Sequence, residues 1–230
     1  MAQNMDNELS YYYDLHPIAE DLMGESWLHR TLTEYLGQVL TWLFSGQVCA
    51  VYANLNFYYR VNQREYPVAP DLAVLNGSPP QNIRSWRVGR SGPAPQVVFE
   101  IASPETWHND LYLKPLMYAR MGVQEYFAYD PHNLSLSRDA SEKFFGPGVE
   151  RQLFGWRLDA DTRLMRLMPV GPAGQLWSEH LESTLMPEPQ WLRLYDRFGQ
   201  LRLTKAEAEA RRAEALAEKL RSLGFNPDQV

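Results

Sequence analysis

The chain has 230 residues, 45% hydrophobic and 22% charged, which is typical of an ordinary globular protein with room for one substantial core. No apolar run approaches the ~20 residues of a membrane span, and the N-terminus lacks the basic and apolar segments of a signal peptide, so we expect a cytoplasmic protein without membrane attachment. The net charge of −6 argues against constitutive nucleic-acid binding, which usually needs a basic face. It does not exclude a nuclease, because clustered metal-binding carboxylates repel phosphate until a divalent cation is bound.

The single cysteine, Cys49, excludes an intramolecular disulfide and a cysteine-based zinc site, and its apolar neighbours predict a core thiol.

The N-terminal part predicts an arm followed by a core helix. Residues 1–26 are polar and aromatic, and the triplet Tyr11–Tyr13 suits packing of this arm onto the domain better than base stacking. From Ser26 to Phe44, leucine and valine recur at helical spacing, with Ser26 as N-cap and Gly46 beyond the end.

Two apolar runs that follow each contain one acid. Gln47 to Arg60 predicts a strand with a bulge near Asn54, and the turn after it leads into the run Val68–Leu75, which carries Asp71, as an antiparallel hairpin. Residues 95–104 predict a strand buried on both faces, with Glu100 inside it. Buried charge is costly unless it is paired or ligates a metal, so these two acids suggest a shared cation.

The loop between these runs, residues 79–93, is basic and aromatic. Arg84, Arg87 and Arg90 surround Trp86. The loop suits contact with phosphates and stacking of a base, whereas the spacing of three equally suits a solvated helical face.

A second helix is predicted from Asn109 to Gly122. Asp110, Lys114 and Tyr118 follow one another at four-residue spacing and should share a face. Pro115 lacks a backbone donor and can kink a helix, so Lys114 need not point along the ideal direction.

The residues after Gly122 predict further strands and then an exposed helix. Gln124–Tyr129 is a buried strand, and the pieces Leu134–Leu136 and Arg163–Met168 predict a β-meander that closes one sheet edge. Trp191 to Leu203 predicts a hairpin that turns at Phe198 and Gly199. From Thr204 to Leu223, a capping box and a narrow alanine-rich seam predict an exposed helix. Self-association of this helix and its docking on the parent domain fit the pattern equally well.

A family resemblance rests on an ordered set of motifs. These are Pro70-Asp71, the strand that ends Glu100-Ile-Ala-Ser-Pro104, Asp110-x-x-x-Lys114-x-x-x-Tyr118-Ala, and Gly122-Val-Gln-Glu-Tyr-Phe-Ala-Tyr-Asp-Pro131. The set, which spans roughly Trp27 to Pro131, resembles the Uma-two-type endonucleases of the PD-(D/E)XK, or restriction-endonuclease-like, superfamily. The resemblance implies an α/β fold: a restriction-endonuclease-like core with a central mixed sheet flanked by helices, a β-hairpin extension and a C-terminal helix. We expect an N-terminal arm over residues 1–26, the core domain over 27–203, and the helix and tail over 204–230.

The resemblance also implies a catalytic site. Asp71, Glu100 and Lys114 would be catalytic, and the two carboxylates with the main-chain carbonyl of Ile101 would hold Mg²⁺ or Mn²⁺, because hard cations prefer oxygen ligands. The superfamily lysine normally stands two residues after the acid, where this chain has Ala102, so the resemblance implies that the lysine has moved to Lys114.

Further residues would support this site. The resemblance points to Asp110, Tyr118, His29 and Glu34, although a capping or solvated histidine and a surface glutamate remain the competing interpretation of the last two. Arg84, Arg87 and Arg90 are the candidates for nucleic-acid contact.

Three functions stay open at this point. The first is metal-dependent hydrolysis of DNA phosphodiesters. The second is a catalytically silent nuclease fold with a regulatory or protein-binding role, and the third is another metal-assisted phosphoesterase. DNA and a second copy of the chain, with the C-terminal helix as one contact, are the partners to expect.

Overall fold

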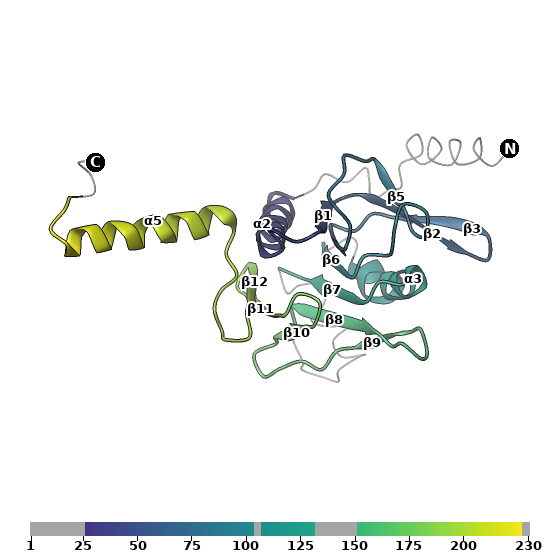
Figure 1. The fold of residues 1–230 in the computed structure, drawn as a ribbon. Helices are drawn as coiled ribbons and strands as arrows, with labels where there is room; N and C mark the ends of the chain where they lie inside the picture. The colour runs from purple at the N-terminus through teal and green to yellow at the C-terminus, as the bar shows by residue number, and fades with distance from the viewer. Residues whose placement is uncertain (1–25, 104–106, 132–150, 227–230) are drawn as a thin grey trace.

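The computed structural model describes residues 26–103, 107–131 and 151–226 (Figure 1). Tyr11–Tyr13, Leu134–Leu136 and nearly all of the predicted arm lie outside the described residues. The helical elements are α2 (Trp27–Leu43), the π-helical turn η1 (Asn109–Leu113), α3 (Lys114–Met121) and α5 (Lys205–Ser222). The strands are β1 (Cys49–Ala53), β2 (Asn56–Val61), β3 (Arg64–Val68), β4 (Leu72–Asn76), β5 (Ser85–Arg87), β6 (Val97–Ile101), β7 (Glu125–Tyr129), β8 (Leu153–Leu158), β9 (Met165–Leu167), β10 (Leu176–Ser178), β11 (Ser183–Glu188) and β12 (Trp191–Tyr195).

The centre of the molecule is a six-stranded mixed sheet in the order β1-β4-β6-β7-β8-β9. β6 and β7 are parallel, and the other neighbours are antiparallel. This confirms the predicted α/β class and the predicted meander at one edge, where β9 overlaps the run Arg163–Met168.

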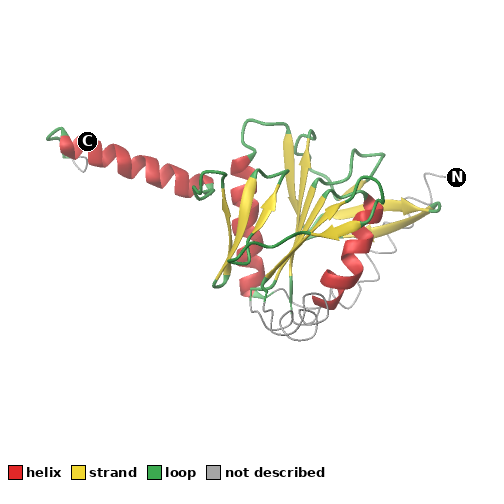
Figure 2. Ribbon diagram, turned by 90° about the horizontal axis from the view of Figure 1, so that it is seen from below, coloured by secondary structure: helices red, strands yellow, loops and turns green. Residues whose placement is uncertain are grey.

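The sheet has an apolar layer on each face because successive side chains of a strand point to opposite sides. Leu72 and Val74 of β4 pack with the buried face of α2, whereas Ala73 and Leu75 pack with the group that contains Tyr118 of α3. The sheet therefore lies between α2 and α3 (Figure 2). The helix α2 begins as predicted, with the Ser26 hydroxyl accepting the N–H of His29 at 3.1 Å.

The prediction of one long strand from Gln47 to Arg60 is wrong. Asn54 takes a left-handed backbone conformation (φ 50°) and separates β1 from β2, which join different sheets. Asparagine tolerates this conformation better than most residues, so the expected bulge is a complete break. The hairpin partner of β2 is β3 rather than the strand after Asp71, and β4 instead pairs with β1.

The small sheet β3-β2-β5 extends from the core (Figure 1) and was not predicted as a separate sheet. β5 runs parallel to β2 and places Trp86 in the core with 1% of its surface exposed. Residues 85–87 are thus a strand rather than a helical face, and Trp86 is not available to stack a base.

A third sheet, β10-β11-β12, covers the α2 side of the molecule, where Leu185, Leu192 and Leu194 join the core around α2. The predicted turn at Phe198 and Gly199 exists, closed by a bridge between Tyr195 and Leu201, but the main partner of β12 is β11.

Helix α5 has the predicted capping box between Thr204 and Glu207 and projects away from the body (Figure 1). None of its residues is buried, so the described protein offers it no docking surface along most of its length. Arg193 of β12 holds its base: the guanidinium donates to the Tyr35 hydroxyl at 2.7 Å and lies 3.9 Å from a Glu207 carboxylate oxygen. Among the described residues, no helix has the length and apolarity to cross a membrane. The domain boundaries stay a prediction.

Candidate active site

The two acids predicted to meet do so where two neighbouring strands part. The pairing of β4 with β6 ends at Leu72 and Phe99, and Asp71 stands just before this point. Its Oδ2 atom accepts the main-chain N–H of Ile101 at 2.6 Å, taking the place of a strand partner. The main-chain N–H of Asp71 in turn approaches Glu100 Oε2 at 3.4 Å. The two carboxylates are therefore next to each other although 28 residues separate them in sequence.

Lys114 reaches both Asp110 and Glu100 because the chain makes a wide helical turn before it. The Lys114 N–H bonds the carbonyl of Asn109, five residues back, and the following Pro115 then opens α3, where a proline is tolerated. Lys114 Nζ lies 2.7 Å from Asp110 Oδ1 and 3.1 Å from Glu100 Oε1. The π-helical turn thus removes the conflict that Pro115 posed for a regular helix.

Two further side chains hold the carboxylates in place. The Tyr118 hydroxyl, one turn after Lys114, donates a hydrogen bond to Glu100 Oε1. His29 Nε2, from the first turn of α2, lies 2.9 Å from Asp71 Oδ2. Helices on opposite faces of the sheet therefore each contribute one partner to the pair of acids.

The site carries an excess of negative charge. Asp71, Glu100 and Asp110 are buried together, with 8%, 2% and 1% of their surfaces exposed, and Lys114 is the one lysine among them. Burial raises the pKa of Glu100 to about 8; the Lys114 charge opposes this shift, whereas the Asp71 and Asp110 charges add to it. Once Glu100 is ionised, the three carboxylates around one ammonium group leave about two negative charges for a divalent cation to balance.

The ammonium and the phenol have fixed protonation states. Burial lowers the pKa of Lys114, but attraction to Glu100 and Asp110 outweighs it and moves the pKa above its usual value. Burial and the Glu100 charge raise the pKa of Tyr118 well above normal. Lys114 is consequently a cation and Tyr118 a hydrogen-bond donor, and neither can act as a base near neutral pH.

The donor set fits a hard divalent cation. Asp71 and Glu100 offer carboxylate oxygens, and the Ile101 carbonyl faces the same side as the Ile101 N–H, toward Asp71, because both groups of a strand residue point to one neighbour. Two carboxylates, one carbonyl and several waters are ordinary ligands for Mg²⁺. Within the described ranges, no group of three or more His, Cys, Asp or Glu side chains has metal-binding geometry. With Asp71 and Glu100 as the two carboxylate ligands, the carbonyl and water would complete the coordination.

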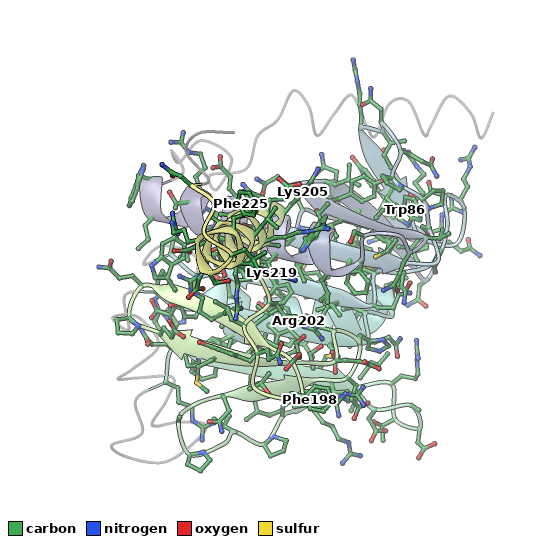
Figure 3. The ribbon with its side chains drawn as sticks, turned by 60° about the vertical axis from the view of Figure 1, so that its left-hand side comes forward. Trp86, Phe198, Arg202, Lys205, Lys219 and Phe225 are labelled. Carbon is green, nitrogen blue, oxygen red and sulfur yellow. The ribbon has the colours of Figure 1, made fainter. Side chains whose placement is uncertain are left out.

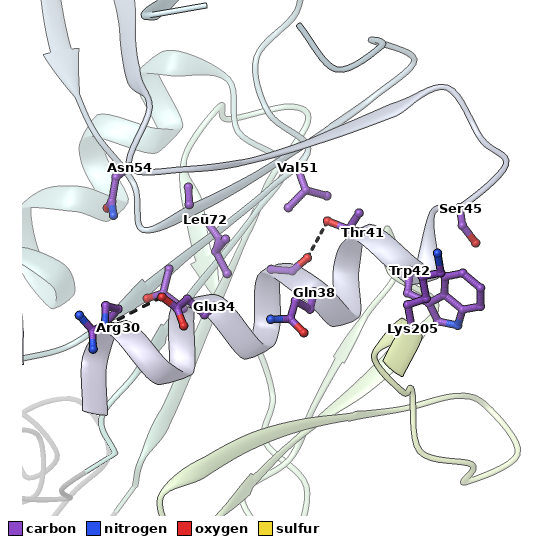
Figure 4. A pocket seen from close by; sticks show the side chains of 13 residues that line it. Arg30, Glu34, Gln38, Thr41, Trp42, Ser45, Val51, Asn54, Leu72 and Lys205 are labelled. Carbon is purple, nitrogen blue, oxygen red and sulfur yellow. Dashed lines mark hydrogen bonds and ion pairs between the residues drawn. The ribbon is translucent and has the colours of Figure 1, made fainter. Parts of the chain in front are cut away.

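Glu34 is not brought to this cluster. Its carboxylate is exposed and lies 3.9 Å from Arg30 on the same helix. Both line a groove of about 810 Å³ between α2 and β1 that extends to Trp42 and Lys205. Figure 4 shows Arg30 and Glu34 at one end of this groove and Trp42 and Lys205 at the other. Leu72 lines the groove, but neither Asp71 nor Glu100 does, so the groove is separate from the two acids.

The three arginines of residues 79–93 differ in their surroundings. Arg87 lies 3.6 Å from a Glu65 carboxylate oxygen and stacks over the Tyr58 ring at 4.9 Å. Arg84 and Arg90 are exposed on either side of β5. Arg87 thus stabilises the small sheet, whereas the other two remain accessible.

One structural partner was not found from the sequence. The hydroxyl of Tyr126 on β7 donates to the main-chain carbonyl of Asp110 at 2.8 Å and is buried below the π-helical turn. Tyr126 lies within the motif Gly122–Pro131 that carries the family resemblance, but the motif does not indicate that its hydroxyl contacts the chain beside Lys114.

Comparison with known families gives the site a context. The model of the Uma2 family, described as "Putative restriction endonuclease", matches residues 6–172, which is most of the chain. The chain belongs to the Uma2 family. Residues 71, 100 and 114 all fall within the matched range. Membership agrees with the motif resemblance and indicates a nuclease of the restriction-endonuclease-like type, a class that generally uses divalent metals.

Similarity to individual proteins is low. A solved structure described as a putative nuclease from Anabaena variabilis is similar to the Uma2 chain, with 15% sequence identity and a TM-score of 0.47. The similarity covers 74% of this chain and 82% of the other. No curated protein matches.

Proposed function

We propose that this Uma2 protein hydrolyses DNA phosphodiester bonds as a divalent-metal-dependent endonuclease. The observation that supports this most is the meeting of Asp71, Glu100 and Lys114 at one point of the sheet. Asp71, Glu100 and the Ile101 carbonyl would hold Mg²⁺ or Mn²⁺. When bound, such an ion acidifies a coordinated water and offsets the charge of the transferring phosphate.

The residues around the ligands would hold charge and position. His29 keeps Asp71 oriented, and Tyr118 keeps Glu100 oriented, in the way that outer partners of metal ligands usually act. Lys114, held by Asp110, offers a fixed positive charge to a phosphate oxygen or to the attacking water. Because the ammonium stays protonated, it stabilises negative charge rather than removing a proton.

DNA binding would depend on few basic groups. Arg84 and Arg90 are the exposed candidates for phosphate contact beside the small sheet. An acidic chain with few such contacts should bind DNA weakly and in a salt-dependent way, with the divalent ion supplying much of the attraction.

The direct test is nicking of supercoiled plasmid by purified protein in the presence of Mg²⁺ or Mn²⁺. We expect nicking by wild type to require the metal and to fall about 100-fold or more in Asp71→Asn, Glu100→Gln and Lys114→Met, as for loss of other preorganised charge partners. The matched control is Glu34→Gln, which removes a nearby acid outside the cluster and should nick like wild type. Nicking that persists equally in all variants, or is absent in wild type with either metal, would contradict the proposal and favour a silent nuclease fold.

A further inference from the structure

Helix α5 exposes apolar side chains that the rest of the described protein does not cover. Leu216 and Leu223 have 59% and 64% of their surfaces exposed. Figure 3 shows the helix nearly end-on in front of the body, with Phe225 near the end that is farthest from the body. Helices in proteins draw most of their stability from packing of an apolar face, so a partner that covers the leucines would stabilise α5.

The leucines towards the C-terminal end of α5 lie on one face together with four of the six alanines of the helix. At about 100° per residue, they occupy roughly 140° of the helix circumference. The face consists of Ala206, Ala210, Ala213, Leu216, Ala217, Leu220 and Leu223. Glu209 is the charged residue within this stretch of the described helix, and its carboxylate lies 3.7 Å from Lys205 at the edge.

The two edges of this face carry opposite charge. One edge has Lys205, Arg212 and Lys219, spaced seven residues apart so that they follow the helix axis. The other edge has acidic residues from its first to its fourth turn, Arg211 on their outer side and Arg221 in the last turn. The acidic residues are Glu207, Glu214 and Glu218.

This asymmetry distinguishes between orientations of a self-paired helix. In a parallel pair with twofold symmetry, the basic edge of each helix lies beside the acidic edge of its partner. In an antiparallel pair, like edges meet, and the basic residues face one another. We propose that α5 is a dimerisation helix that pairs in parallel with α5 of a second copy of this chain.

Parallel pairing has a consequence for the nuclease site. Both bodies then lie at the same end of the paired helices, because α5 leaves each body at its N-terminal end. If the proposed function holds, a dimer presents two catalytic sites to one DNA duplex, one for each strand. The pairing itself is independent of catalysis and is tested without an activity assay.

Light scattering during size-exclusion chromatography of the full chain tests the pairing. We expect wild type at micromolar concentration to have twice the 26.6 kDa mass of one chain. Leu216→Glu places a charge on the apolar face and should restore the mass of a single chain. The neighbouring residue gives the matched control, since Ala215→Glu places the same charge on the opposite face and should leave the dimer intact.

A cysteine cross-link tests the orientation. Ala206→Cys brings two thiols together in a parallel pair, whereas an antiparallel pair places residue 206 opposite residue 220 of the partner, about 20 Å from the other thiol. Mild oxidation should therefore yield a disulfide-linked dimer in Ala206→Cys and none in wild type, whose Cys49 is buried. A monomeric wild type or a dimer that survives Leu216→Glu overturns the α5 interface, and a dimer that does not cross-link overturns the parallel arrangement.

Discussion

Glu100 illustrates the conflict between stability and function at the scale of one residue. Its carboxylate is buried beside two other acids, and hydrogen bonding to Tyr118 and attraction to Lys114 do not bring its pKa back to normal. A group chosen only for stability would not be an acid here. Such local cost is a feature of sites that await a charged ligand.

This cost should appear as a pH-dependent effect of Glu100→Gln in metal-free protein. The ordinary pKa of the carboxyl is 4.5 and its pKa in the folded protein is about 8, so between these values the folded chain keeps a proton that the unfolded chain releases. The Glu100 contribution to the free energy of unfolding therefore falls as pH rises from about 4.5 to about 8. Glutamine does not titrate, so we expect the variant to gain stability relative to wild type across this window and the gain to level off above it.

Urea unfolding of both proteins in EDTA at several pH values measures this difference. A free-energy difference that stays constant, or that shrinks as pH rises, would be inconsistent with a raised pKa for Glu100.

At the scale of elements, the sequence predicted where helices and strands lie better than it predicted which strands pair. The periodicity of α2 and the apolar run of β6 identify these elements, because α2 is buried along one face and β6 on both. Near Asn54 the sequence predicted a bulge but not a complete break, because only the pairing partners separate β1 from β2.

The sequence predicted most residues of the candidate site, but it did not predict how the backbone brings Lys114 to the two acids. Asp71 and Glu100 stood out as acids inside apolar runs, and the family resemblance added Lys114. The π-helical turn that lets Lys114 avoid the Pro115 problem depends on buried partners such as Tyr126, which lie far away in sequence. The resemblance also suggested Glu34, which the structure places in a separate groove.

The small sheet offers a test of packing at this scale. Gly92 lies against the buried Trp86 ring, and a Cβ atom there would come within 2.3 Å of Trp86 Cζ2. We expect Gly92→Ala to lower the free energy of unfolding by about 1–3 kcal/mol through overpacking. Gly37→Ala is the control, because this glycine lies within α2 with 3.4 Å to its nearest neighbour, and alanine should stabilise the helix by about 0.5–1 kcal/mol. Denaturant midpoints of the two variants that move in the same direction would contradict this packing.

For the whole molecule, charge links the fold to its proposed activity. The chain is acidic overall, and its candidate site adds three buried carboxylates to one lysine. Phosphate would be repelled from such a site without a cation, so metal binding should precede or accompany DNA binding. The metal-binding step is therefore the part of the account on which hydrolysis, DNA attraction and the use of two sites in a dimer all depend.

Calorimetric titration of wild type with Mn²⁺ measures that step directly. We predict saturable binding of one ion per chain, lost in both Asp71→Asn and Glu100→Gln and retained in Glu34→Gln. Absence of saturable binding in wild type, or binding that survives in both Asp71→Asn and Glu100→Gln, would contradict a metal site formed by Asp71 and Glu100.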